Sequence, residues 1–143
     1  MSDLQPKGAV LIFNGEERHL FWDFGVIEKV QEMYGEHPFF AIKKMLWEGK
    51  DDDGTRLQHY QAKPLLDLTE ILINNDAARE KYFNGIDLRK YTREEIGMLI
   101  DRENVNMVVA AIISSWSDAI GGKKDADDDE EEDEKNLTSG QQN

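Results

Sequence analysis

The apolar residues between Val105 and Ile120 recur with the period of an α-helix, and this pattern constrains the fold more than any other part of the sequence. Steps of three and four residues place these side chains on one wide face of a helix, which other elements must cover. The residues of the stripe are Val105, Val108, Val109, Ile112, Ile113, Trp116 and Ile120. The sequence therefore predicts a helix with a broad apolar face inside a helical domain.

Earlier segments show weaker helical signals of the same kind. Pro38 suits the first turn of a helix, and Gly35 and Gly49 suit helix ends, so one helix is expected to stop at each glycine. Thr92 and Glu95 have the spacing of a capping box, in which each side chain bonds the backbone N–H of the other residue. The expected helical segments are 24–34, 38–48, 64–73 (ending before Asn74-Asn75), 76–82 (closed by Asn84-Gly85), 92–100 and 105–120.

A β-hairpin is predicted near the N-terminus. Two β-prone runs, 9–13 and 18–22, flank Asn14-Gly15, and both turn residues accept a positive φ. A three-residue loop is the favoured register, because it gathers Val10, Ile12, Leu20 and Trp22 on one face. The predicted fold class is therefore mainly α with a small N-terminal β-hairpin, an α+β arrangement.

Charge divides the chain into a body and an acidic tail. The net charge is −13, and residues 123–135 carry nine acids against three lysines, a net of −6 that leaves −7 for the rest. With almost no apolar side chains, that tail cannot repay the entropy of folding. The predicted organisation is a flexible arm over 1–7, a hairpin-plus-helical domain over 8–122 and a disordered acidic tail over 123–143.

Composition and motifs argue against several function classes. There are no cysteines, and His19, His37 and His59 lack metal-ligand spacing, so neither a metal nor a cofactor site is predicted. No phosphate-binding glycine loop or nucleophile elbow is present, which indicates a protein that is not an enzyme. The acidic balance disfavours nucleic-acid binding, and no apolar run is long enough for a membrane span. A weaker alternative is that the acidic tail mimics DNA.

Two stretches resemble a known family. Residues 7–20, Lys-Gly-Ala-Val-Leu-Ile-Phe-Asn-Gly-Glu-Glu-Arg-His-Leu, followed by residues 24–35, Phe-Gly-Val-Ile-Glu-Lys-Val-Gln-Glu-Met-Tyr-Gly, resemble the opening of small phage tail assembly chaperones of the siphophage and gene-transfer-agent type. Residues 92–96, Thr-Arg-Glu-Glu-Ile, with the valine- and isoleucine-rich final helix, are similar to their closing segment.

The resemblance implies a role in assembling the tails of a phage or prophage in the cytoplasm of the bacterial host. Chaperones of this family bind the tape-measure protein, keep it soluble and help to recruit the major tail protein. Many are also made as a longer frameshifted product. The alternative is a small structural component of the tail or neck that stays in the virion, which mass spectrometry of purified particles would reveal.

The final helix is the predicted partner-binding element, since its apolar stripe is wider than a small domain usually needs. One edge, with Val105, Val108, Ile112 and Ala119, is assigned to the core. The other edge is assigned to a partner or to self-association and consists of Val109, Ile113, Trp116 and Ile120.

Overall fold

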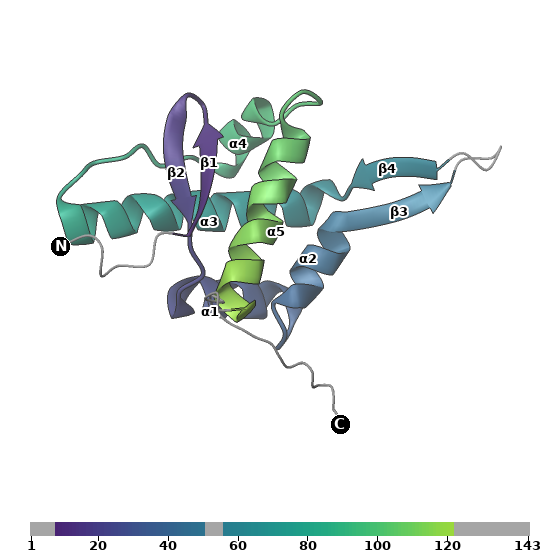
Figure 1. Cartoon of the computed structure of the whole chain (residues 1–143), viewed down its shortest axis with the longest axis horizontal. Coiled ribbons are helices and arrows are strands. Elements are labelled where there is room, and N and C mark those ends of the chain that lie inside the picture. The colour runs from purple at the N-terminus through teal and green to yellow at the C-terminus, as the bar shows by residue number, and fades with distance from the viewer. Residues whose placement is uncertain (1–7, 51–55, 122–143) are drawn as a thin grey trace, which may run out of the picture.

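The structure, a computed structural model, describes residues 8–50 and 56–121 (Figure 1). The chain is mostly helical with an N-terminal β-hairpin, which confirms the predicted fold class. The flexible arm over 1–7 and the acidic tail over 123–143 are predictions that lie outside the described residues. The elements are β1 (Ala9–Phe13), β2 (Glu16–Leu20), α1 (Phe24–Tyr34), α2 (Phe39–Met45), β3 (Leu46–Lys50), β4 (Arg56–Tyr60), α3 (Ala62–Asn84), α4 (Arg93–Leu99) and α5 (Val105–Gly121).

The long helix α3 forms the base on which the other elements pack (Figure 1). Helix α5 crosses in front of α3 and lies beside the β1–β2 hairpin, while α1 and α2 close the lower side in this view. The β3–β4 hairpin projects from one end of the molecule. Among the described helices, none combines the length and apolar character needed to cross a bilayer.

The N-terminal hairpin has the predicted turn but not the predicted register. Asn14 and Gly15 both have positive φ, and the strands pair antiparallel with Phe13 opposite Glu16, so the loop has two residues. Leu11 and Phe13 therefore face the core, whereas Val10 and Ile12 are each 54% exposed. The predicted three-residue loop was wrong, because it assumed that only apolar side chains face the core. The inner face of the hairpin also holds a charged residue, Arg18, which is fully buried. The inner-face residues are Ala9, Leu11, Phe13, Arg18 and Leu20.

Helix α1 ends at the predicted Gly35, but α2 does not run to Gly49. It ends at Met45, and the chain continues directly into β3, where Leu46 has an extended backbone. Strand β3 pairs antiparallel with β4, with Leu46 opposite Tyr60. The sequence analysis missed this second hairpin, because the apolar spacing around Met45 and Leu46 also fits a helix.

The two helices expected over 64–73 and 76–82 are a single helix, α3. Asn74 and Asn75 were expected to interrupt it, but their side chains bond other parts of the fold and leave the helical backbone intact. Asn74 accepts a bond from the backbone N–H of Tyr91 at 2.8 Å and donates one to its carbonyl at 2.8 Å. The predicted end at Gly85, with φ of 70°, and the capping box of Thr92 and Glu95 are both confirmed.

The core lies where α5 meets the N-terminal hairpin and α3. Trp22, just after β2, packs edge to face on Trp116 of α5 with the ring centroids 4.9 Å apart. The indole N–H of Trp22 donates to the hydroxyl of Ser115 at 2.8 Å, so its polar atom is satisfied. These contacts attach the final helix firmly to the N-terminal part of the chain.

Candidate functional site

The predicted partner-binding edge of α5 is divided between core and surface. Val109 and Trp116 are buried in the core, Ile113 is partly buried against it, and only Ile120 is largely exposed, at 65%. The apolar stripe is wide because α5 packs on the hairpin along one side and on α3 along the other. As folded, the buried part of the predicted edge does not reach a partner.

The structure places the exposed ring of His37 beside Trp116, and the exposed rings of Phe39 and Phe40 lie around His37. The ring of His37 lies 6.2 Å from that of Trp116, 6.2 Å from that of Phe39 and 6.0 Å from that of Phe40, measured between centroids. Phe39 and Phe40 are 40% and 49% exposed. Ile120 follows Trp116 by one helical turn on the same face of α5. The core therefore continues into an exposed aromatic surface at this point.

This surface is held by the turn that opens α2. The Nδ1 atom of His37 accepts a hydrogen bond from the backbone N–H of Phe39 at 3.1 Å, and the His37 carbonyl accepts one from Phe40 at 2.9 Å. The opposite side of α2 is buried through Ala41, Ile42 and Met45. The orientation of α2 is thus fixed, and its exposed side is presented to solvent. We call the residues of that side the α2 face: His37, Phe39, Phe40, Lys43 and Lys44.

A cleft of about 570 Å³ adjoins the α2 face. It lies between the end of α1, α2 and the start of α3, and its charged lining side chains are all lysines. Met33 and Leu46 add partly exposed apolar surface. We call it the lysine cleft; its lining residues are Met33, Tyr34, Lys43, Lys44, Leu46, Gln61, Lys63 and Pro64.

A buried carboxylate holds one wall of the lysine cleft in place. Asp67 accepts hydrogen bonds from the Tyr34 hydroxyl at 2.6 Å and the Lys63 ammonium at 2.8 Å, and it also pairs with Arg93. Burial raises the pKa of Asp67, but the bonds from Lys63, Tyr34 and Arg93 outweigh it and bring the pKa below 3.8. Burial and the bond to Asp67 raise the pKa of the Tyr34 hydroxyl.

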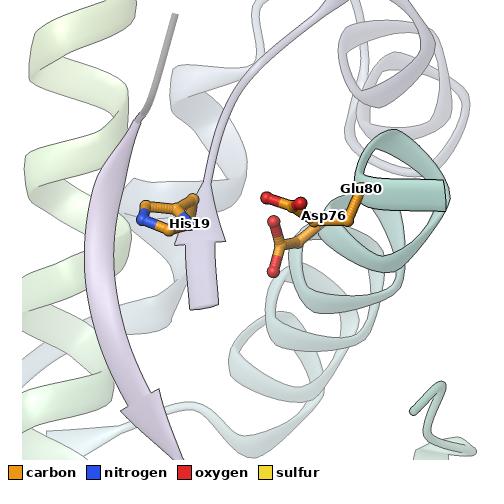
Figure 2. Close-up of side chains that lie close together, drawn as sticks. All are labelled: His19, Asp76 and Glu80. Atoms are coloured by element: carbon orange, nitrogen blue, oxygen red, sulfur yellow. The ribbon is translucent and has the colours of Figure 1, made fainter. Parts of the chain in front are cut away.

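A second cluster, which the sequence analysis missed, joins β2 to α3. His19, Asp76 and Glu80 each offer one ligand atom, and these atoms lie within 4.8 Å of one another. Figure 2 shows both carboxylates on the side of α3 that faces the hairpin. The spacing of Asp76 and Glu80, one turn apart on α3, was the only local signal in the sequence. The approach of His19 depends on how the hairpin packs.

An imidazole and two carboxylates are donors that suit a divalent metal ion, but two members of this cluster already lie near polar groups from outside it. Arg18 Nη1 lies 3.8 Å from Asp76 Oδ2, and His19 Nε2 lies 3.2 Å from Glu17 Oε2. Burial raises the pKa of Asp76 above its ordinary value. The hydrogen bond from the backbone N–H of His19 and the charge of Arg18 lower this pKa, but the effect of burial is larger. We assign the cluster to holding the open edge of β2 against α3.

No family model matches the chain, and no curated protein or solved structure matches it either.

Proposed function

We propose that this chain is a tail assembly chaperone of a phage or prophage that binds the tape-measure protein through the α2 face. The observation that carries the proposal is the pair of adjacent phenylalanines, Phe39 and Phe40, held exposed beside the core. In this role the chain acts without catalysis in the host cytoplasm. It keeps the tape measure soluble while the major tail protein is recruited.

The chemistry of the α2 face fits an amphipathic helix as the bound partner. Burying a phenylalanine side chain contributes about 1.5–3 kcal/mol, and a few such anchors dominate most interfaces. Lys43 and Lys44 lie one turn after the phenylalanines and are exposed, so they favour acidic residues along the polar edge of the partner helix. The net charge of −13 would keep a complex with a long apolar partner dispersed.

Co-expression with the tape-measure protein of the same genome tests this proposal. The intact chain is expected to keep the tape measure in the soluble fraction. Replacing Phe39→Ser and Phe40→Ser together should return most of it to the pellet, because the two apolar anchors are lost while the buried side of α2 is unchanged.

The matched control is Tyr82→Ser with Phe83→Ser, another adjacent and exposed aromatic pair. It lies near the end of α3, a 23-residue helix about 35 Å long, whose start borders the lysine cleft. This control should retain full activity. If the α2 variant keeps its native circular dichroism and still holds the tape measure in solution, the proposed surface is wrong.

Mass spectrometry of purified particles separates the chaperone from the alternative virion component. The proposal expects the chain to be absent from finished particles, whereas a structural tail or neck protein would be present in stoichiometric amounts.

A further inference from the structure

The lysine cleft is a basic surface on a strongly acidic molecule. Lys43, Lys44 and Lys63 line it, and among the side chains that the structure describes no acidic residue does. Lys63 and Arg93 both form ion pairs with Asp67. Two positive charges therefore face one negative charge, and the wall of the cleft has a net positive charge. Among the side chains that the structure describes, no carboxylate lies within ion-pair distance of Lys43 or Lys44. Such a site suits a ligand with several carboxylates.

A second cleft shows that exposed lysines alone do not leave a cleft with unpaired positive charge. It is lined by Lys81, Asp87 and Lys90 among others, near the end of α3. There the Lys81 ammonium lies 2.8 Å from the Asp87 carboxylate, and the pair is largely satisfied by itself. This cleft therefore serves as an internal comparison for any acidic ligand.

The chain itself contains a ligand of the required chemistry. Residues 125–134 hold nine acids in ten positions, and the described chain ends at Gly121 on α5. That end of α5 lies beside the start of α2, since Trp116 packs near His37. An extended chain spans up to about 3.3–3.6 Å per residue, so the six residues 122–127 reach roughly 20 Å. Lys43 lies only about 4.5 Å further along α2 than Phe40.

We propose that residues 125–134 bind the lysine cleft of their own chain. Carboxylates of this segment pair with Lys43, Lys44 and Lys63, and the short connection to α5 raises the local concentration of the segment to the mM range. The segment would then lie next to Phe39 and Phe40 and compete with a partner for the α2 face. The competition rests on the proposed function, whereas the contact itself does not.

A spin label tests the contact directly, because the chain has no cysteine and a single new one can be labelled cleanly. The change is Ala126→Cys in the full chain, carrying a nitroxide. At low salt, the amide signals of residues 43–46 and 61–63 should fall below about half of their intensity in the reduced sample, given the mM local concentration. Signals of residues 81–90, around the comparison cleft, should keep most of their intensity.

Three controls show whether the lysines of the lysine cleft cause the broadening. Lys43→Glu with Lys44→Glu should restore the signals, and so should about 1 M salt, where the Debye length falls to about 3 Å. The matched variant Lys81→Glu with Lys90→Glu should leave the broadening unchanged. Equal broadening at both clefts, no broadening at all, or broadening only between labelled and unlabelled chains in a mixed sample would overturn the proposal.

The same label separates this inference from the proposed function. Phe39→Ser with Phe40→Ser leaves the lysines in place, so the broadening at the lysine cleft should persist even when the tape measure is no longer held in solution. Loss of broadening in that variant would mean that the phenylalanines, and not the lysines, hold the segment, and it would also overturn the proposal.

Discussion

Arg18 is the residue that most changes the fold from what local pattern suggests. It is fully buried on the inner face of the N-terminal hairpin, where its guanidinium donates to the carbonyls of Ile73 and Arg89 and to Glu16. A hydrophobic pattern assigns such a residue to solvent, and this is why the predicted register was wrong. A buried charge is tolerated when bonds and opposite charges compensate it. Glu16 belongs to the hairpin, but the carbonyls of Ile73 and Arg89 come from distant parts of the chain and cannot be foreseen from the hairpin sequence.

Asp67 and Asp76 are both buried, yet their effects on stability should depend on pH in opposite directions. The pKa of Asp67 is lowered, so its contribution is full above its unfolded pKa and is lost as pH falls through the folded pKa. The pKa of Asp76 is raised, so its ionised form opposes folding near neutral pH, and that cost disappears as pH falls.

Urea unfolding of Asp67→Asn and Asp76→Asn from about pH 6 to about pH 3 checks these signs. At pH 6 the Asp67 variant should be less stable than the wild type by about 2 kcal/mol, since hydrogen bonds to a charged group are lost. This difference in the free energy of unfolding should become smaller as the pH falls. The stability of the wild type relative to the Asp76 variant should rise over the same range. If the stabilities of the two variants, each relative to the wild type, changed in the same direction with pH, the opposite pKa shifts of Asp67 and Asp76 would be contradicted.

At the scale of elements, turns and helix ends followed from local chemistry, and tertiary contacts decided the rest. The Asn14-Gly15 turn, the stop at Gly35 and the capping box at Thr92 depend on residues a few positions apart, and all three were predicted. Within the continuous α3, the side chain of Asn74 bonds the backbone of Tyr91, 17 residues away. Register, the second hairpin and the His19–Asp76–Glu80 cluster likewise required knowing which elements meet.

Asn74→Ala tests how much the contact between α3 and Tyr91 stabilises the fold. Alanine has the better helix propensity, by about 0.7 kcal/mol or less, so an isolated helix would gain stability. In the folded chain the change removes both bonds to the backbone of buried Tyr91 and should cost about 1–3 kcal/mol in the free energy of unfolding. Asn84→Ala, at the exposed end of the same helix, is the control and should change stability little. A neutral or stabilising Asn74→Ala would show that the contact contributes nothing.

At the scale of the whole molecule, apolar and basic groups gather on the surface around α2, although the chain as a whole is acidic. The α2 face offers two exposed phenylalanines and two lysines, and the lysine cleft continues from it along the start of α3. The apolar stripe of the sequence predicts α5 as the binding element, whereas we propose α2, which begins just after His37, the residue whose ring lies near Trp116 of α5. Helical spacing identified the apolar residues but not which of them other elements cover.

The most direct test of the account is to map where a partner binds. A synthetic helical segment of the tape-measure protein is titrated into the full chain labelled with ¹⁵N, and amide shifts are followed to saturation. We expect the largest shifts to cluster over residues 37–46 and around Ile120, and Phe39→Ser with Phe40→Ser to abolish them. Saturable shifts confined to the outer face of the N-terminal hairpin at Val10 and Ile12, or to Tyr82 and Phe83, would contradict it, as would the absence of saturable binding.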